Sequence, residues 1–237
     1  MEQEITSNVN RREVKQTPSI SINPITLFVN ASKAKKISIV KNQKNPPPIP
    51  TSYYASATAA MKRYIKNGFD VDVILDAINE LQSKSIDPSK DKALAKRSNQ
   101  INALRNFLEI TFPETFKTIK CSFTTSRFKP CIISNVEVTV SPDIIIRRDD
   151  NGVKYIGAIK FDVHKDQLDF SIGQQRASLL NYYLEIIKGD DEIVDKNYCL
   201  CVDVMHDNIY RPNLDISKDI ALISEACKEV VEIWKIV

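Results

Sequence analysis

The chain has 237 residues, of which 43% are apolar, and its 33 basic and 30 acidic side chains leave a net charge of +3. This composition suffices for a substantial hydrophobic core, and the charge is too small to indicate nucleic-acid binding by itself. We find no apolar run of about 18 residues, which argues against a membrane-spanning helix, and the polar start Met1-Glu2-Gln3-Glu4 does not resemble a signal peptide. The odd number of cysteines, five, favours reduced thiols and a cytoplasmic protein.

The N-terminal part of the chain is expected to form an extension, which we place at residues 21–97. Residues 1–20 are polar and lack periodicity, as is typical of a mobile arm. Apolar and polar side chains alternate over 25–29 and 36–40, which predicts a hairpin. A stiff connection is predicted at Pro46-Pro47-Pro48, with Pro50 just beyond it.

Three helices are predicted after this connection. They cover residues 52–66, residues 71–83, and a segment that starts at Asp87-Pro88. Basic residues recur along the last of these helices and just after it: Lys90, Lys92, Lys96, Arg97 and Arg105. Such a row could neutralise phosphates, although a solvated helix surface is the commoner explanation.

Residues 98–237 predict an α/β core with a mixed central sheet flanked by helices. A helix is expected over 98–111, and further helices are expected over 170–187 and from Ser217, the predicted N-cap. Strands are expected over 118–124, 135–147, 153–164 and 198–204. We find no internal repeat in the sequence, and the length fits either one large domain or a domain with an extension.

The two central strands are predicted to form a hairpin through Asn151-Gly152, which is a strong turn signal between apolar runs. If these two residues form the loop, Asp150 pairs with Val153. Counting back along both strands then places Asp143 directly opposite Lys160. The sequence therefore predicts that this carboxylate and this ammonium group share one face of the sheet.

Polar residues alternate with apolar ones on both strands of this hairpin. The polar set comprises Glu137, Thr139, Ser141 and Asp143 on the first strand and Lys160, Asp162 and His164 on the second. We expect the two strands to bury one face in the core and to gather these polar side chains on the opposite face. A structural salt bridge between Asp143 and Lys160 explains the pair as well as a functional role does.

The pair resembles the motif of the PD-(D/E)xK nuclease superfamily, in which Pro-Asp on one strand is followed on the next by an acidic residue, any residue, and Lys. Pro142-Asp143 and Lys160 match this motif, whereas Ala158 stands where the second acidic residue belongs. The resemblance implies a restriction-endonuclease-like α-β-β-β-α-β core. It covers roughly residues 102–212.

The resemblance also implies a metal site and a reaction. Asp143 would bind Mg²⁺ or Mn²⁺, Asp162 or Glu137 would complete the ligand shell, and Lys160 would position the attacking water. In the RecB-like exonuclease branch, the following helix carries a Gln and, about two turns later, a Tyr. Gln175 and Tyr182 lie on one face of the predicted helix and would steady the phosphate or the nucleophile's surroundings.

Ala158 leaves three interpretations open. In the first, the position is degenerate in a protein that binds without cleaving. In the second, the missing carboxylate comes from elsewhere, either from Asp162, about 7 Å further along the strand, or from Glu109 or Glu114. In the third, the alanine was introduced by engineering. The hypothesis we carry forward is a metal-dependent nuclease that acts on DNA or RNA, in microbial defence or repair. The alternative is an inactive nuclease-fold protein that serves as a nucleic-acid-binding or scaffold subunit, as a homo-oligomer or with a partner protein. An unrelated α/β interaction protein, whose hairpin merely mimics the motif, is a third class.

Overall fold

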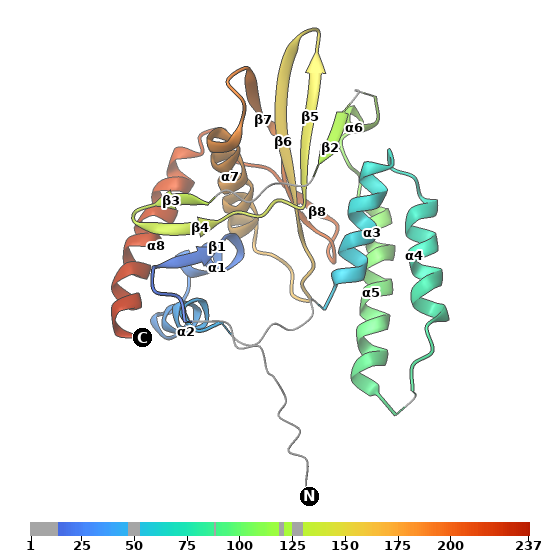
Figure 1. Cartoon of the computed structure of the whole chain (residues 1–237), viewed down its shortest axis with the longest axis horizontal. Helices are drawn as coiled ribbons and strands as arrows, with labels where there is room; N and C mark the ends of the chain where they lie inside the picture. The colour runs from blue at the N-terminus through green and yellow to red at the C-terminus, as the bar shows by residue number, and fades with distance from the viewer. Residues whose placement is uncertain (1–13, 47–52, 88, 119–120, 125–129) are drawn as a thin grey trace, which may run out of the picture.

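A computed structural model describes residues 14–46, 53–87, 89–118, 121–124 and 130–237. Within these residues the chain forms a mixed α/β structure with two sheets (Figure 1). The larger sheet has the strand order β2-β5-β6-β7-β8, and the smaller has the order β1-β4-β3. The strands of the larger sheet are β2 (Cys121–Thr124), β5 (Ile144–Asp150), β6 (Val153–Asp162), β7 (Glu192–Asp203) and β8 (Asn208–Tyr210).

The larger sheet is mixed in direction. Strands β2, β5 and β6 form an antiparallel meander, β7 runs parallel to β6, and β8 returns antiparallel to β7. A parallel pair needs a crossover connection, and helix α7 (Phe170–Ile187) supplies it between β6 and β7. The expected α/β class with a mixed central sheet is therefore confirmed.

Helices cover both faces of the larger sheet (Figure 1). One face packs against α7, α8 (Ser217–Ile236), α1 (Ile22–Val29) and α2 (Lys33–Lys44), together with the small sheet of β1 (Ser19–Ser21), β3 (Cys131–Ile133) and β4 (Val136–Thr139). The other face packs against α3 (Ala55–Lys66), α4 (Asp72–Ser83), α5 (Asp91–Glu109) and α6 (Thr115–Thr118). Each face has its own apolar cluster, so both sides of the central strands are buried.

The hairpin expected within residues 25–40 is wrong, because this segment forms helices α1 and α2. Ile22, Ile25 and Phe28 recur at three-residue spacing, which places them on one buried helix face. Ser32 caps α2, and its Oγ accepts a hydrogen bond from the Lys35 amide. Buried side chains of both helices belong to the same apolar cluster as those of α7 and α8, so this segment packs on the face of the large sheet that α7 covers.

The expected boundary between residues 97 and 98 falls inside a single helix. The helix predicted to start at Asp87-Pro88 and the helix predicted over 98–111 form one helix, α5, because no glycine or proline interrupts the chain between Asp91 and Glu109. The turn before it is held by Asp87, whose Oδ1 accepts hydrogen bonds from the Ser89 amide and hydroxyl. The other two predicted helices of the extension are confirmed as α3 and α4, and Gly68, at φ +74°, follows the end of α3.

The single strand expected over 135–147 is also wrong. Its first half is β4 of the small sheet and its second half is β5 of the large sheet, with Ser141-Pro142-Asp143 between them. Pro142 has no amide hydrogen to donate to a strand ladder, which fits a break at this point. Of the remaining elements, α7 has the predicted bounds, α8 starts at Ser217 as predicted, and β7 begins earlier than expected, at Glu192.

Three further expectations concern the ends of elements. Ser217 is not the N-cap of α8; its amide donates to Asp215 Oδ1, and the cap residue Ile216 makes no side-chain cap. Most of the expected mobile arm lies outside the described residues, but Ser19–Ser21 forms β1, which pairs in parallel with β4. Pro47, Pro48 and Pro50 of the expected stiff connection also lie outside the described residues.

Candidate functional site

The β5–β6 hairpin has the predicted register. Asp150 pairs with Val153 and Ile144 pairs with Ile159, and both loop residues, Asn151 and Gly152, have positive φ angles of 53° and 86°. Such angles are typical of the two-residue turn that matches strand twist. The Asp143 amide extends the ladder by one step, donating to the Ile159 carbonyl at 2.8 Å. Asp143 therefore lies opposite Lys160, as the sequence predicts.

The Asp143 carboxylate is surrounded by donors. Its Oδ2 accepts from Lys160 Nζ at 2.8 Å and from the Phe161 amide at 2.9 Å. Its Oδ1 lies 2.8 Å from Nζ of Lys62, which reaches it from α3 on the other side of the sheet. The side chain of Asp143 is only 9% exposed, whereas that of Lys62 is 31% exposed. One buried carboxylate thus holds two ammonium groups in place.

These contacts set the charge of the site. Burial raises the pKa of the Asp143 carboxyl, but the neighbouring ammonium groups of Lys160 and Lys62 outweigh it and hold the pKa below its ordinary value. Asp143 therefore stays ionised at neutral pH, and two ammonium groups and one carboxylate together carry one positive charge. Each ammonium has three donor hydrogens, so both lysines keep hydrogens for a further anionic partner.

Asp162 lies two residues beyond Lys160 on the same strand, and a cation also neutralises it. Its Oδ2 is 2.7 Å from Nη1 of Arg176 on α7, in a contact that is not aligned for a hydrogen bond. Arg176 Nε donates to Thr26 Oγ1 at 3.1 Å. The side chains of Arg176 and Asp162 are 3% and 12% exposed, so this ion pair is largely buried.

Sequence reasoning missed Arg176, Asp203 and Lys62. Arg176 lies three, four and seven residues before the buried Leu179, Leu180 and Tyr183, and this spacing marks it as part of the inner helix face. Asp203 is opposite Asp162 in the β6–β7 register and accepts from the Leu168 amide at 3.0 Å, while His206 Nδ1 lies 3.0 Å from its Oδ1. No sequence signal indicates Lys62, because its partner is 81 residues away in the chain.

The other predicted site residues are not brought to Asp143. Glu137 lies on β4 in the small sheet, paired with Ser19 and Ile132. Tyr182 is partly buried against the cluster of α7 and α8. Gln175 is buried, and its Oε1 has no hydrogen-bond partner within the described part of the chain.

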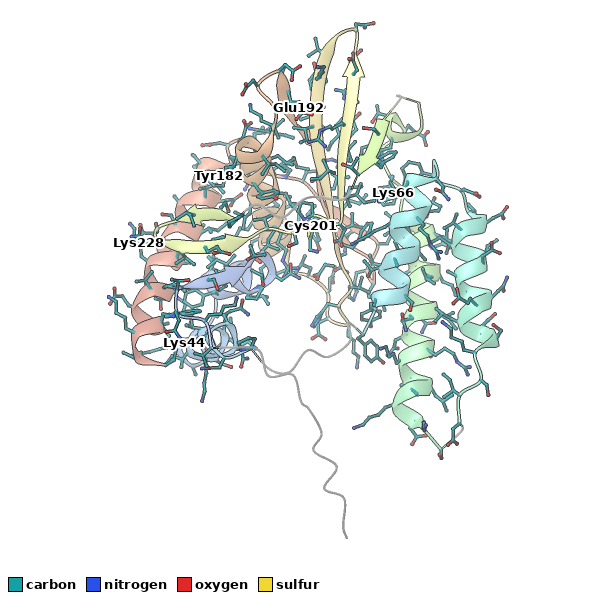
Figure 2. All side chains as sticks on the ribbon, viewed as in Figure 1. Lys44, Lys66, Tyr182, Glu192, Cys201 and Lys228 are labelled. Carbon is teal, nitrogen blue, oxygen red and sulfur yellow. The ribbon has the colours of Figure 1, made fainter. Side chains whose placement is uncertain are left out.

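Two further residues of the predicted motif region are Ala158 on β6 and His164 just after it. His164 lies beyond the end of β6, and its Nδ1 accepts from the Asp166 amide at 3.3 Å. Ala158 is fully buried in the apolar cluster beneath α7. The strands are expected to bury one face in the core and to gather polar side chains on the opposite one, but α7 packs on that opposite face. The charges of Asp143, Lys160 and Asp162 are therefore compensated by ion pairs within the protein. Cys201, the register partner of Lys160 on β7, lies near the middle of the molecule (Figure 2).

The arranged carboxylates do not fit a divalent cation. A hard cation needs several free oxygen ligands, but both oxygens of Asp143 are bonded to lysines and Asp162 faces a guanidinium. Among the described residues, no group of three or more His, Cys, Asp or Glu side chains converges to hold a metal. A metal at Asp143 Oδ1 would have to displace Lys62.

Comparison with known proteins adds no family. No protein-family model matches the sequence, and a search of curated proteins finds no significant match. None of the described helices is long and apolar enough to cross a membrane.

Proposed function

We propose that this chain is a catalytically inactive, nuclease-like protein that binds nucleic acid through the two ammonium groups held by Asp143. The observation that carries this proposal is the occupation of both Asp143 oxygens, at 2.8 Å each, by Lys62 and Lys160. The fully buried Ala158 supports it, since a carboxylate at that position would have to lie in an apolar cluster.

The order of elements supports the nuclease-like framework. Helix α5 is followed by β2, β5 and β6, then by α7 and β7, which is the expected α-β-β-β-α-β order apart from the short α6 and the small-sheet strands. The Asp143 and Lys160 side chains meet at the hairpin where the resemblance places its motif. Fold likeness alone does not fix an activity, so the proposal rests on the charges at this point.

Phosphate is the ligand chemistry that suits this pair. An ion-paired lysine that is partly exposed still donates hydrogen bonds to an incoming anion, and charge-assisted bonds to phosphate are among the stronger ones. The net positive charge of the cluster favours a phosphate over a neutral ligand. Asp143 would act as a positioning residue, which holds both ammonium groups close together.

The second candidate is a metal-dependent nuclease acting on DNA or RNA, with Mg²⁺ or Mn²⁺ as cofactor, in a microbial defence or repair setting. The observation that favours it is the direct pairing of Asp143 with Lys160 across the hairpin. Asp162 is the nearest further carboxylate on the same strand, and it would have to leave Arg176 to act as a ligand.

Cleavage and binding assays on the same protein separate the two candidates. Labelled single- and double-stranded DNA and RNA are incubated with Mn²⁺ for cleavage, and the same strands are titrated by filter binding at two salt concentrations. We expect binding without cleavage, and we expect Lys62→Ala and Lys160→Ala each to lower the salt slope by about one. Lys154→Ala, at the far end of the hairpin, is the matched control and should leave the slope unchanged.

Three results would contradict this assignment. Cleavage by the wild-type protein that Lys160→Ala abolishes would favour the nuclease. Absence of both binding and cleavage would reject a nucleic-acid function altogether. Binding that is unaffected by Lys62→Ala and Lys160→Ala would place the ligand elsewhere on the protein.

A further inference from the structure

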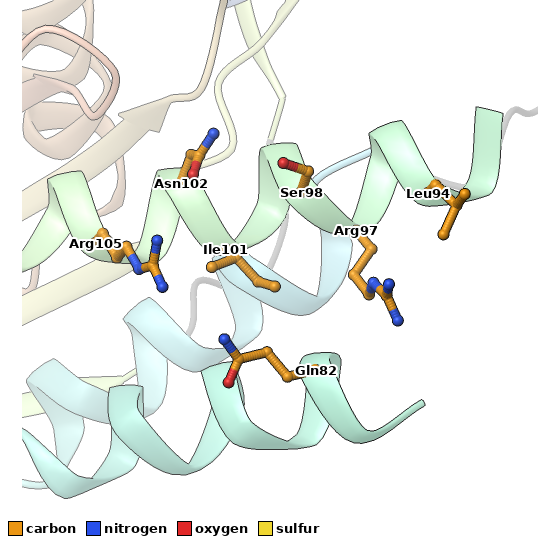
Figure 3. A pocket seen from close by; sticks show the side chains of 7 residues that line it. All are labelled: Gln82, Leu94, Arg97, Ser98, Ile101, Asn102 and Arg105. Carbon is orange, nitrogen blue, oxygen red and sulfur yellow. The ribbon is translucent and has the colours of Figure 1, made fainter. Parts of the chain in front are cut away.

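A groove between helices α4 and α5 gathers basic side chains away from the Asp143 site. Its volume is about 410 Å³, and it is lined by Gln82 of α4 and by Leu94, Arg97, Ser98, Ile101, Asn102 and Arg105 of α5. Arg97 and Arg105 flank Ile101 on its α5 side, and Gln82 faces them from α4 (Figure 3). Ser98 and Asn102 also line the groove, with a hydroxyl and an amide.

Neither guanidinium group forms an ion pair within the described part of the chain. Arg97 Nη1 donates one hydrogen bond to the Lys84 carbonyl at 3.0 Å, and its other N–H groups have no hydrogen-bond acceptor among the described residues. Arg105 is exposed and makes no ion pair or hydrogen bond with the described residues. Of the described residues that line the groove, none carries a carboxylate. By contrast, Arg147 and Arg148 on β5 and Arg176 on α7 each face a carboxylate within 3.0 Å.

We propose that this groove binds the phosphate backbone of a nucleic-acid strand, so that α5 forms a second contact surface for the ligand of the Asp143 site. The inference rests on the proposed function. A guanidinium presents a planar fork that matches phosphate oxygens, and uncompensated arginines on a shared groove are typical of such contacts. Ser98, Asn102 and Gln82 can add neutral hydrogen bonds to the backbone.

The spacing along α5 favours a strand over a single phosphate. Arg97 and Arg105 are eight residues apart, which corresponds to about 12 Å along the helix axis. The ligand that uses both arginines therefore carries more than one phosphate. Ile101, which is 8% exposed, forms an apolar floor between them and offers no hydrogen bond that would fix one small anion.

The test is fluorescence anisotropy of the full chain with a labelled oligonucleotide over a salt series. We expect Arg97→Ala/Arg105→Ala to weaken binding at least tenfold at low salt and to lower the salt slope by about two. Lys33→Ala/Lys35→Ala on α2 removes the same charge from another part of the molecule and is the matched control (Figure 1). Both double variants change exposed or half-exposed helix residues to alanine, so they should keep the wild-type melting temperature.

The outcomes distinguish this inference from the proposed function. If Arg97→Ala/Arg105→Ala binds like the control while Lys62→Ala and Lys160→Ala bind weakly, the groove proposal fails and the Asp143 site stands. The opposite pattern supports the groove and rejects the Asp143 site. A mononucleotide or inorganic phosphate that competes as well as the oligonucleotide would overturn the assignment of a strand, and absence of any binding would overturn both proposals.

Discussion

Lys62 on α3 and Asp143 just before β5 are joined by a contact of 2.8 Å between Nζ and Oδ1, although α3 packs on one face of the sheet and the Asp143 side chain has the phase of the other face. The apolar side of α3 belongs to the cluster on one face, whereas Ile145, in phase with Asp143, belongs to the other. The contact therefore connects the layer of helices α3, α4 and α5 to the end of the β5–β6 hairpin that lies opposite its turn. It brings a cation from a distant segment to a carboxylate that already has a partner in Lys160.

The first prediction concerns the stability of the protein in acid. The folded-state pKa of Asp143 is lowered from its ordinary value of 3.8, so its contribution to the free energy of unfolding is fully present above that value. The contribution is lost as the pH falls through the lowered, folded-state pKa. Urea unfolding from pH 7 to pH 2 should therefore show the stability advantage of the wild type over Asp143→Asn shrinking below about pH 4.

Lys62→Met tests the cause of this pH dependence. It removes one of the two ammonium groups that lower the Asp143 pKa, so the loss of stability in acid should be smaller and should be complete at a higher pH, because the folded-state pKa lies closer to its ordinary value. Lys66→Met, one turn further along α3, is the control and should leave the profile unchanged. A gap between wild type and Asp143→Asn that stays constant down to pH 2 would contradict the lowered pKa.

The second prediction concerns the buried Arg176–Asp162 pair. Arg176→Met leaves the Asp162 carboxylate inside the protein without its cation, and breaking such a pair typically costs about 3–5 kcal/mol. Arg147→Met makes the same chemical change at a guanidinium that is 41% exposed, and it should cost much less. The loss in the free energy of unfolding of each variant is measured by urea denaturation. Equal losses in the two variants would show that the Asp162 carboxylate is not held by Arg176.

Adding Asp162→Asn to Arg176→Met extends the test. The double variant removes the unpaired charge as well, so it should recover part of the stability that Arg176→Met loses. If the losses in the free energy of unfolding of the two single variants add up in the double variant instead, Asp162 and Arg176 contribute to stability independently.

The third prediction concerns Gly173 on α7. A Cβ at this position would lie 2.3 Å from Cγ of the Tyr210 ring, a distance at which the ring must move. The Tyr210 hydroxyl is anchored by its hydrogen bond to the Leu168 carbonyl at 2.8 Å, which restricts that movement. Gly173→Ala should therefore lower the melting temperature, although alanine is the better helix former by about 1 kcal/mol.

Gly189→Ala provides the matched control for this steric argument. A Cβ there would meet its nearest neighbour at 3.4 Å, an ordinary contact, and Gly189 does not have a positive φ. We expect little change in its melting temperature. In a double-mutant cycle, Gly173→Ala should cost less in a Tyr210→Ala background than in the wild type. Equal costs in the two backgrounds would reject the clash as the cause.

The parts of the fold that could be predicted from sequence are those with a local signal. Asn151-Gly152 fixes the hairpin turn and hence the pairing of Asp143 with Lys160, because one turn determines the register of both strands. The apolar spacing along α7 and α8 likewise identifies both helices. The alternation over 25–29 gave the wrong prediction of a strand in place of α1, because so short a segment fits a period of 2 residues and a period of 3.6 residues about equally well.

What could not be predicted depends on contacts between distant segments. Lys62 meets Asp143 only because α3 packs beside the start of β5, and no spacing rule links the two positions. The covering of the polar face by α7 is likewise a tertiary effect, and it brings Arg176 rather than solvent to Asp162. The split of residues 135–147 between two sheets follows from Pro142, whose effect depends on where the chain turns.

The last prediction concerns the reactivity of the cysteine thiols. Burial raises the pKa of Cys199, Cys201 and Cys227 to about 12 each, and that of Cys131 to about 11. All four are at most 1% exposed. The thiolate is the reactive form, so at pH 8 these groups are both inaccessible and almost entirely protonated.

In a Cys121→Ser background, a colorimetric thiol reagent at pH 8 should therefore label none of these four cysteines in the folded protein and all of them in urea. Labelling in low urea should follow the population of opened molecules. Its rate should rise with the same denaturant dependence for Cys199 and Cys201, which share β7, if the large sheet opens as one unit. Replacing the exposed Ser122 by cysteine in the same background supplies a positive control that reacts at once. Rapid labelling of Cys201 without denaturant would contradict the packing around Lys160, because Cys201 is its direct neighbour on β7.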